Sequence, residues 1–398
     1  MWTRPVPDDP PRPASRLRAT IVVEQVRRQV PGGIGTYAHG LLQGLSRVRP
    51  LPDVTITASP IRTRVPDPLR AYPFPIVEAG GRWLAALAHQ RQLPRAQSQV
   101  VTRLWDRGFA QVGSGPRGRA DIVHSVSLAA PPTGGTPLTV MIHDVAWRQV
   151  PEAYPPRGLA WHERALRRVG RTATAVAVSS RVAADELARA SAELDPSRIE
   201  VIPLGCDHLP PPDLEASRAL LRRLGVHGDY LLTVSTIEPR KNLPRLIEAY
   251  GRARRQLPEP WPLLVVGPAG WGAEIAAPEG VVIAGRASGA VLSALYASAR
   301  LMVYVPLVEG FGLPAVEALL AGTPLLVSSA VPSIVEHDSP AVVVDALSTE
   351  AIASALAELA TDDSRLEALA RAGPASVAGR TWEATARRHI EWWTEVAG

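Results

Sequence analysis

The sequence predicts two doubly wound α/β domains that face each other across a cleft. Short apolar runs alternate with longer amphipathic segments, a pattern typical of parallel sheets covered by helices. This alternation runs through the chain twice, and a proline cluster at 210–212 separates the two series. The length of 398 residues is sufficient for two separate cores.

Composition narrows the class of protein further. Hydrophobic residues make up 46% of the chain and charged residues 20%, values typical of a globular protein. No apolar run reaches the roughly 18 residues that a membrane-spanning helix requires, and the N-terminus lacks the apolar core of a secretory signal. The single cysteine, Cys206, has no intrachain partner for a disulfide. We therefore expect a cytoplasmic protein.

The net charge of +5 is unevenly distributed. Residues 61–120 hold ten arginines and three acidic residues, a net charge of +7, with aromatic residues interleaved. This mixture suits an anionic membrane surface or a phosphorylated acceptor, and it suits equally a solvated helical face in an arginine-rich protein. We expect helices and loops over 61–112, with peripheral attachment to the inner face of the cell membrane as one role for the segment.

The N-terminal half begins, in this prediction, after a disordered lead-in at 1–18. A strand at 19–24, a glycine-rich turn at 31–35 and an amphipathic helix then follow in order. This order is common where nucleotides or phosphates bind, so Gly33 and Gly35 are candidate donor contacts. Any doubly wound domain can begin this way, so the motif has low specificity. Further strands are expected at 54–59, 121–125, 138–143, 173–179 and 199–204, with helices at 161–169 and 180–189.

Polar residues follow the strand at 138–143. His143 and Asp144 stand at its carboxyl end, where ligands of open α/β sheets bind. We expect His143 to be functional; the alternative is a histidine that packs against or caps a loop. His124, at the end of the neighbouring strand, is better explained as a core residue.

The second half repeats the pattern after an expected hinge at 205–212. The final segment at 381–396 is amphipathic and rich in tryptophan, so we expect it to dock on a domain surface. The predicted units are 19–205, 206–380 and a C-terminal helix, 381–398, that returns toward the N-terminal domain. Strands of this half are expected at 230–235, 262–267, 281–284, 301–305, 324–328 and 341–344, with helices at 243–255, 291–299 and 349–359.

Composition singles out two adjacent residues. Of 43 basic residues, 42 are arginine; Lys241 is the only lysine, and Asn242 is the only asparagine. Asn242 is expected to cap a helix that begins at 243, with Pro244 in its first turn. Lys241 and Arg240 would then lie beside the positive end of that helix and could bind an anion. An ordinary capped surface helix is the alternative.

Residues 305–329 read as a strand end, a glycine-rich turn, a short helix and another strand. Gly310 and Gly312 allow the backbone to approach a ligand closely, and Pro314 suits the first helical turn. The exposed amide groups at this helix start form a natural anion site.

Two carboxylates stand on either side of this turn. Glu309 precedes the helix, and Glu317 lies about one turn into it. An anion on the amides and hydroxyl groups on the carboxylates would suit such a site. A sugar nucleotide offers both groups.

Six motifs together resemble the retaining nucleotide-sugar glycosyltransferases of family 4 (glycosyl transferases group 1), which have the GT-B fold. The motifs occur in the family's order and span nearly the whole chain after residue 18. The EGFGLP core combined with EPRKN is the most specific part. The motifs are GGIGTY (32–37), IHDVAWRQVPEAYP (142–155), VIPLGCD (201–207), EPRKN (238–242), VVGPAGWG (265–272) and VEGFGLPAVEALLAGTP (308–324).

The resemblance implies a nucleotide sugar in the cleft, bound mainly by the C-terminal domain. Arg240 and Lys241 would neutralise the diphosphate, with help from the amides of Phe311, Gly312 and Leu313. Glu317 would bind the ribose hydroxyl groups, and Glu309 would bind hydroxyl groups of the transferred sugar.

The N-terminal domain would complete the site. His143 would contact the transferred sugar, and the loop from Gly33 to Gly35 would approach the phosphates or the acceptor. The resemblance implies that no metal is needed, because two cations and a helix start can stabilise the leaving diphosphate. No other cofactor is expected; the nucleotide sugar is a co-substrate. The sequence departs from the family in one place: many members have a Gly-Arg pair where this chain has Ser235 and Thr236, and Arg240 would substitute.

The expected reaction is front-face substitution with retention, in which the departing phosphate accepts the proton of the acceptor. The motif at 142–155 favours GDP-mannose, and dTDP-rhamnose is an alternative donor. The acceptor is expected to be lipid-linked, phosphorylated or a glycan. Competing interpretations are a nucleotide-sugar epimerase of similar fold and a non-catalytic sugar-nucleotide-binding subunit. A nucleic-acid binder is disfavoured because the chain has no recognised nucleic-acid module.

Overall fold

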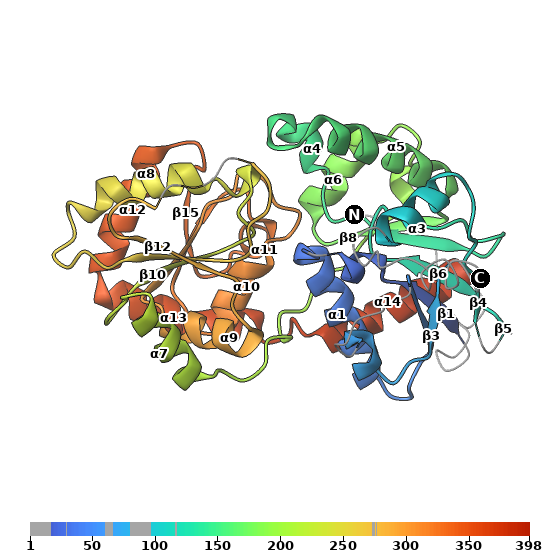
Figure 1. Ribbon diagram of the computed structural model, residues 1–398, viewed down its shortest axis with the longest axis horizontal. Helices are drawn as coiled ribbons and strands as arrows, with labels where there is room; N and C mark the ends of the chain where they lie inside the picture. Colours follow the sequence, from blue (N-terminus) through green and yellow to red (C-terminus); the bar gives the residue numbers. More distant parts are fainter. Residues whose placement is uncertain are drawn as a thin grey trace.

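The computed structural model describes residues 17–28, 30–59, 67–79, 97–115, 118–272, 275 and 277–398. It has two α/β lobes, each built on a parallel sheet with helices on both faces (Figure 1). The predicted fold class is confirmed. We call these the N lobe and the C lobe.

The sheet of the N lobe has seven parallel strands in the order β3-β2-β1-β6-β7-β8-β9. The chain starts in the middle, proceeds to one edge, and then returns to build the other half. The resulting switch point lies between β1 and β6. The strands are β1 (Arg18–Val22), β2 (Asp53–Ala58), β3 (Ile76–Glu78), β6 (Ile122–Ser125), β7 (Leu138–Met141), β8 (Ala175–Val178) and β9 (Ile199–Val201), and a small hairpin joins β4 (Ser114–Gly115) to β5 (Gly118–Arg119).

The sheet of the C lobe has six parallel strands in the order β12-β11-β10-β13-β14-β15, with its switch point between β10 and β13. Ligand sites in such sheets lie at the carboxyl ends of the strands beside the switch point. The strands are β10 (Leu231–Val234), β11 (Leu263–Val266), β12 (Val281–Gly285), β13 (Leu301–Tyr304), β14 (Leu325–Ser328) and β15 (Val342–Val344).

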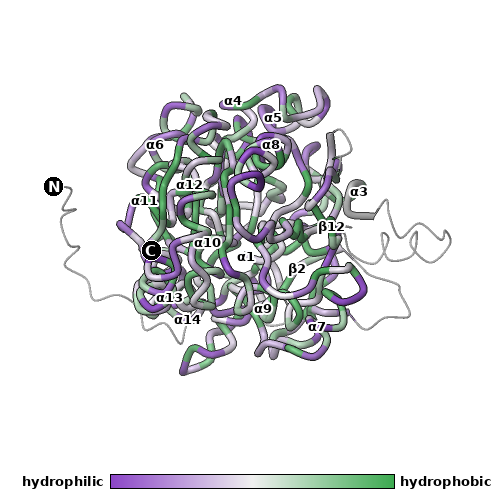
Figure 2. The backbone as a smooth tube through the Cα atoms, turned by 90° about the vertical axis from the view of Figure 1, so that its left-hand side faces the viewer, coloured by the Kyte–Doolittle hydropathy of each residue, from purple (hydrophilic) through white to green (hydrophobic). Residues whose placement is uncertain are grey.

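Helices cover both faces of each sheet (Figure 1), and the apolar segments run through the interior (Figure 2). Among the described helices, none combines the length and apolarity needed to cross a membrane. The helices are α1 (Gly32–Arg47), α3 (Gln97–Asp106), α4 (Ala146–Gln149), α5 (Pro156–Thr172), α6 (Arg181–Ala190), α7 (Leu214–Arg223), α8 (Leu243–Arg254), α9 (Gly289–Ser298), α10 (Leu313–Leu320), α11 (Pro332–Val335), α12 (Thr349–Thr361), α13 (Asp363–Val377) and α14 (Trp382–Ala397).

Each predicted strand is present, with ends within three residues of those expected. The sequence interpretation missed β3, the hairpin of β4 and β5, and the helices α4, α7, α11 and α13. Most of the predicted lead-in lies outside the described residues, but Arg18 already belongs to β1. Its side chain donates to Asp121 at 2.9 Å, which fixes the start of the strand.

In the basic segment at 61–120 the described arginines are exposed, whereas two of the described aromatic residues are buried. Trp105 and Phe74 are 1% and 6% exposed and belong to the core of the N lobe. Tyr72 hydrogen-bonds to His39, and only Phe109 is an exposed aromatic residue in the described part of this segment. Residues 61–66, 80–96 and 116–117 lie outside the described residues.

The C-terminal helix α14 packs against α1, although the preceding helix α13 belongs to the C lobe (Figure 1). Close approach of the two helices depends on glycine. A Cβ atom at Gly40 would lie 2.1 Å from the ring of Trp382, and one at Gly44 would lie 2.0 Å from the Trp382 carbonyl oxygen. The chain therefore crosses between the lobes twice.

A buried hydrogen-bond network joins α1, β6 and α14. The Tyr37 hydroxyl lies 2.9 Å from His124 Nε2 and 2.8 Å from His389 Nε2. His389 Nδ1 donates to the Thr385 carbonyl, so its Nε2 accepts from Tyr37, and the Tyr37 oxygen in turn accepts from His124. This arrangement requires His389 to be neutral, because its Nε2 acts as an acceptor.

We predict that the protein loses stability as the pH falls below about 6.5. Burial lowers the pKa of His389 to about 4 and lowers that of His124 well below its usual value. The unfolded chain takes up these protons near pH 6.5, whereas the folded protein does not until lower pH. For His389 alone, the free energy of unfolding should fall by about 2 kcal/mol between about pH 6.5 and about pH 5.

Urea denaturation at about pH 7.5 and about pH 5 tests this prediction. His389→Gln should weaken the pH dependence, whereas His227→Gln, at an exposed position, should leave it unchanged. An identical pH dependence in wild type and His389→Gln would show that the network is not the cause.

Candidate active site

A cleft of about 470 Å³ lies between the lobes and is lined by residues from both. The N lobe contributes the glycine-rich turn, the segment after β7 and the start of α5. The C lobe contributes the segments that follow β10 and β13. The carboxyl ends of both sheets therefore face the cleft, as expected for doubly wound domains.

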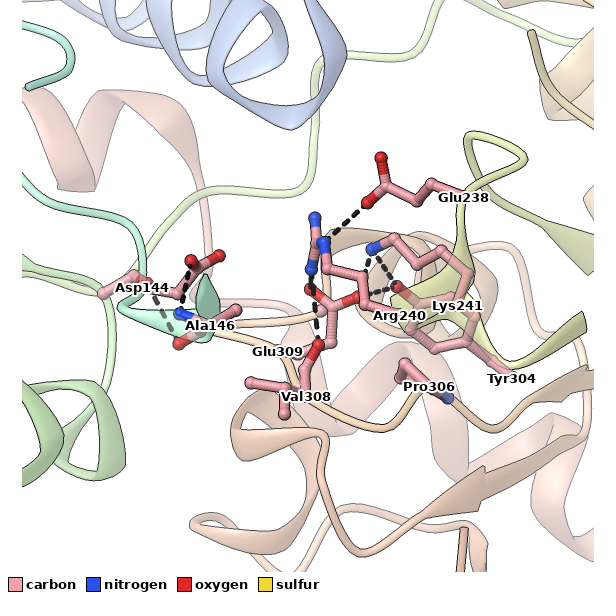
Figure 3. A network of polar contacts seen from close by, with 12 residues as sticks. Asp144, Ala146, Glu238, Arg240, Lys241, Tyr304, Pro306, Val308 and Glu309 are labelled. Carbon is pink, nitrogen blue, oxygen red and sulfur yellow. Dashed lines mark hydrogen bonds and ion pairs between the residues drawn. The ribbon is translucent and has the colours of Figure 1, made fainter. Parts of the chain in front are cut away.

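Arg240 lies between two carboxylates at the C-lobe wall (Figure 3). It belongs to a short 3-10 helix, Pro239–Lys241, that follows β10. Its Nε lies 2.5 Å from Glu238, and its Nη1 lies 3.4 Å from Glu309. Nη1 also donates to the Val308 carbonyl at 3.3 Å, so one guanidinium ties the two loops together.

Lys241 contacts the same carboxylate from the other side. Its Nζ forms an ion pair with Glu309 and donates to the Tyr304 hydroxyl at 3.2 Å. Tyr304 in turn donates to Glu309 at 2.5 Å. Glu309, which follows β13, thus accepts hydrogen bonds from both cations and from the Tyr304 hydroxyl.

These contacts determine the charge states. Burial alone would raise the pKa of Glu309, but Lys241 and Arg240 outweigh burial and hold it at about 2. Burial and the neighbouring Arg240 lower the pKa of Lys241, and Glu309 offsets this only in part. Burial opposes the charge of Arg240 as well, but Glu309, Asp144 and Glu238 raise its pKa well above the usual value.

The sequence interpretation of Arg240 and Lys241 as an available anion-binding pair is therefore modified. The structure brings both cations to the cleft, but Glu238 and Glu309 already balance their charge. An anionic ligand would have to share the two cations with these carboxylates.

Asn242 does not cap α8 with its side chain, contrary to the sequence prediction. Its backbone adopts a left-handed conformation with φ of 60°. The side-chain amide instead donates to the carbonyls of Val305 and Ala346, at 3.0 and 2.8 Å. Asparagine tolerates this backbone conformation better than most residues, and its amide fixes the loop that carries Lys241 to the segments that follow β13 and β15.

The turn before α10 leaves its first amides free. Gly312 has φ of 94°, a conformation that favours glycine, and Pro314 occupies the first helical turn as predicted. The amides of Phe311, Gly312 and Leu313 donate no hydrogen bond to any described residue, and all three residues line the cleft. The start of α10 can therefore receive an anion.

Gly310 forms a direct contact between the lobes. The hydroxyls of Ser179 and Ser180 lie 3.2 and 2.7 Å from its carbonyl and donate to it. A Cβ atom at Gly310 would lie 1.6 Å from the carbonyl oxygen of His143 and 3.2 Å from the Cβ of Asp144. A larger residue would push the two walls of the cleft apart.

We predict that Gly310→Ala lowers both thermal stability and activity. The overlap with backbone of the opposite lobe should reduce the unfolding midpoint by on the order of 5 °C. Gly251→Ala in α8 is the matched control, because a Cβ there meets nothing within 4 Å. Equal unfolding midpoints for the two variants in calorimetry would contradict the predicted overlap.

His143 lies on the N-lobe wall in a fixed orientation. Its Nε2 donates to the Val126 carbonyl at 3.0 Å, and its ring meets the edge of Tyr37 at a centroid distance of 5.0 Å. Burial lowers its pKa, which the Val126 carbonyl and Asp144 offset only in part. A neutral His143 thus keeps Nδ1 available as a hydrogen-bond acceptor.

The structure brings most of the predicted site residues to the cleft but leaves two outside its lining. Gly33, His143, Arg240, Lys241, Glu309, Gly310, Phe311, Gly312 and Leu313 line the cleft, whereas Gly35 and Glu317 do not. Glu317 is 7% exposed; it accepts from Tyr296 at 2.8 Å, and its Oε1 lies 3.2 Å from His208 Nε2.

Sequence reasoning missed other residues of the cleft wall. Tyr304 and Glu238 orient the two cations, and both follow or end a strand, which was the available signal. Trp271 lies in the loop after β11, and its indole donates to the Ala153 carbonyl across the cleft at 2.7 Å. Arg28 lines the N-lobe side. Within the described residues, no group of three or more His, Cys, Asp or Glu side chains could hold a metal ion.

Two family models match most of the chain. Residues 31–208 match the model described as glycosyltransferase family 4, and residues 224–376 match the model described as glycosyl transferases group 1. The first match falls in the N lobe and the second in the C lobe.

Curated relatives of moderate identity include mannosyl- and inositol-phosphate glycosyltransferases. O-antigen chain mannosyltransferase B of Escherichia coli is 28% identical over 253 residues, which cover 61% of this chain and 66% of that protein. A D-inositol 3-phosphate glycosyltransferase of Segniliparus rotundus is 32% identical over 48% of this chain and 46% of that protein. In both, the chain matches less than two thirds of the relative. The corresponding Thermobispora bispora protein is 30% identical over 70% of this chain and 71% of its own length.

Solved structures share the fold at low identity. Anabaena Alr3699/HepE in complex with UDP and glucose superposes with a TM-score of 0.66 at 16% identity, covering 96% of this chain and 100% of that chain. The sucrose-phosphate synthase of Thermosynechococcus elongatus gives a TM-score of 0.70 at 16% identity, covering 96% and 99%.

Proposed function

Because the chain belongs to the GT-B glycosyltransferases of family 4 (glycosyl transferases group 1), we propose that it moves a sugar from a nucleotide diphosphate sugar to an acceptor hydroxyl. The proposal rests on the arrangement of groups on the C-lobe wall of the cleft. There, free amides at the start of α10 lie in the same cleft as Arg240, Lys241 and Glu309. The Anabaena neighbour was solved with UDP and with UDP-glucose, which supports a nucleotide sugar as donor.

In this proposal the diphosphate lies on the amides of Phe311, Gly312 and Leu313 and against the two cations. Glu309 binds hydroxyl groups of the transferred sugar, and His143 contacts that sugar from the N lobe. Gly33 and the glycine-rich turn approach the phosphates or the acceptor.

The proposed ribose contact of Glu317 has a structural requirement. The carboxylate is nearly buried and contacts Tyr296 and His208, outside the cleft lining. The ribose would therefore have to replace or share these contacts. His208 belongs to the segment that joins the lobes, so binding at Glu317 would also affect that connection.

The proposed chemistry is front-face substitution with retention. Breaking the anomeric bond builds negative charge on the diphosphate, and preorganised amides and cations stabilise charge that develops there. This cluster would do the work of a metal ion, and we propose that none is required. The departing phosphate takes the proton of the acceptor. Trapping a covalent glycosyl-enzyme on Glu309 would overturn this mechanism.

Mannose is the sugar we favour for transfer. The Escherichia coli relative is named a mannosyltransferase, and a Mycolicibacterium smegmatis relative, 28% identical over 267 residues, is named a GDP-mannose-dependent phosphatidylinositol monomannoside mannosyltransferase. The names of these relatives and of the inositol-phosphate enzymes agree with a lipid-linked, phosphorylated or glycan acceptor. We place this work in the cytoplasm, with attachment to the inner membrane face as part of the proposal.

A thermal-shift screen with GDP-, UDP- and dTDP-sugars should identify the donor. A ligand that binds only the folded protein raises its stability by mass action, by about 2.7 kcal/mol at a concentration one hundred times its Kd. We expect GDP-mannose to give the largest shift. No shift with any nucleotide sugar would contradict the proposed function.

Two other functions make different predictions. A non-catalytic binding subunit would show the thermal shift without turnover that depends on Lys241. An epimerase would convert the nucleotide sugar in the absence of an acceptor. The cluster of two cations, free amides and Glu309 suits stabilisation of a leaving diphosphate, which favours transfer over both.

A further inference from the structure

Arg28 is a cleft-lining cation that differs from the other two. It follows β1 and the 3-10 helix Glu24–Arg27 on the N-lobe side. Arg240 and Lys241 are paired with carboxylates. The backbone N–H of Arg28 donates to the Gln25 carbonyl, but its side chain makes no hydrogen bond or ion pair with any residue that the structure describes. Its side chain is exposed. This guanidinium is therefore available to a ligand.

The guanidinium of Arg28 lies over an aromatic ring. Its central carbon is 6.0 Å from the centroid of Trp161, within the range of a cation–π contact. Trp161 lies near the start of α5 and also lines the cleft. The contact orients a planar group whose parallel N–H donors fit phosphate and carboxylate.

Further aromatic rings extend this wall of the cleft. His162 meets the edge of Trp161 at 4.9 Å and stacks on Trp147 at 4.7 Å, while Tyr154 lies 5.8 Å from His162. His162 Nδ1 donates to the Gly158 carbonyl at 2.7 Å, so the neutral ring keeps Nε2 as an acceptor for a hydroxyl group. Rigid rings and one acceptor suit the apolar and polar faces of a sugar or cyclitol.

This wall lies opposite the residues that we assign to the donor. Arg28 and Trp161 line the cleft from the N lobe, whereas Arg240 and the start of α10 line it from the C lobe. An anion bound at Arg28 would therefore sit on the acceptor side.

From these contacts we infer that Arg28 and Trp161 form a subsite for an oxyanion, a phosphate or a carboxylate, carried by the acceptor. The aromatic wall at Tyr154 and His162 would lie against the acceptor ring. The inference rests on the proposed function, because it assigns the opposite wall to the donor diphosphate.

Binding to pairs of sugars that differ by one anionic group tests the inference. The donor site is first saturated with the nucleoside diphosphate selected in the thermal-shift screen. Mannose is then compared with mannose 6-phosphate, and glucose with glucuronate, by calorimetric titration. Wild type should bind an anionic member at least about tenfold more tightly than its neutral partner. Tighter binding of mannose 6-phosphate alone would identify the oxyanion as a phosphate. Tighter binding of glucuronate as well would show that a carboxylate is also accepted.

Variants then attribute this preference to Arg28. Arg28→Gln should abolish it, Arg28→Lys should retain part of it, and Arg365→Gln, on the exposed face of α13, should leave it unchanged. Nucleoside diphosphate affinity should be the same in all four proteins. Equal binding of neutral and anionic sugars to wild type, or a preference that survives in Arg28→Gln, would overturn the inference.

The two proposals can fail separately. If no nucleoside diphosphate or nucleotide sugar binds, the proposed function fails, and the same titrations without nucleotide still decide whether Arg28 binds an oxyanion. If nucleotides bind and transfer occurs without any preference for anionic sugars, only the subsite inference fails.

Discussion

Lys241→Ala is expected to lower the rate of sugar transfer strongly and to weaken donor binding. The ammonium group of Lys241 is one of two cations that face the site proposed for the diphosphate, and it also holds Glu309 in place. Loss of a charge that stabilises the leaving group should lower turnover by about three orders of magnitude. The nucleotide sugar should bind about tenfold more weakly, because a charged contact is lost. Steady-state kinetics and calorimetric titration measure the two effects.

Lys241→Ala also removes a partner of a buried carboxylate, so its effect on stability must be separated from its effect on catalysis. Removing Lys241 leaves Glu309 buried with Arg240 as its remaining cation, at 3.4 Å. Breaking a buried pair in this way can cost several kcal/mol. The double variant Lys241→Ala with Glu309→Gln removes the charge left behind. We expect it to recover thermal stability without recovering transfer. A double variant that regains activity would show that Lys241 acts only by neutralising Glu309.

Glu309→Ala is expected to lose turnover while keeping nucleotide affinity. Glu309 is assigned to the hydroxyl groups of the sugar, so its loss should reduce transfer by about two to three orders of magnitude. The contacts of Glu309 also predict the effect on nucleoside diphosphate binding. Glu309 neutralises Lys241 and part of Arg240, so its removal should leave nucleoside diphosphate affinity unchanged or increase it.

Comparison of kcat with the Kd of the nucleoside diphosphate tests this assignment. Glu248→Ala, an exposed change in α8 on the surface of the same lobe, is the control and should alter neither quantity. Because the pKa of Glu309 is held at about 2, its ionisation should not appear in the pH profile of transfer at higher pH. A variant that loses nucleotide affinity and keeps turnover would mean that the roles of Glu309 and Lys241 are reversed.

Much of the fold could be predicted because the relevant signals are local. Each core strand is a short apolar run, and parallel strands bring their carboxyl ends to one edge. This placed His143, Arg240 and Glu309 around one cleft without knowledge of any contact. Pro314 likewise indicated the first turn of α10, because proline favours that position whatever the surrounding structure.

What could not be predicted depends on contacts between distant segments. The burial of Glu317 follows from Tyr296 and His208, and the network at Tyr37 involves His389, which is 352 residues away. Capping preference suggested that the Asn242 side chain caps α8, but its amide donates to two carbonyls in the segments that follow β13 and β15. The aromatic residues between the arginines of 61–120 suggested a surface for a membrane or an acceptor, whereas the ring of Trp105 is buried.

The sequence also could not predict which cation pairs with which carboxylate. EPRKN and EGFGLP each contain charged residues, but nothing in their spacing shows that Lys241 contacts Glu309 or that Arg240 lies between Glu238 and Glu309 (Figure 3). The two cations are therefore not free, as the sequence suggested, because two carboxylates balance their charge. The free amides at the start of α10 therefore become the primary position for an incoming anion.

The central claim is that this cleft transfers the anomeric carbon of a nucleotide sugar to an acceptor hydroxyl. The most direct test is NMR of a donor labelled with ¹³C at the anomeric carbon, incubated with enzyme and the acceptor selected by binding. We predict that the coupling of this carbon to phosphorus disappears as a new glycosidic signal of unchanged anomeric configuration appears, and that Glu309→Ala prevents both changes. A carbon that stays bonded to phosphate, either unchanged or in an epimerised sugar, would contradict the account.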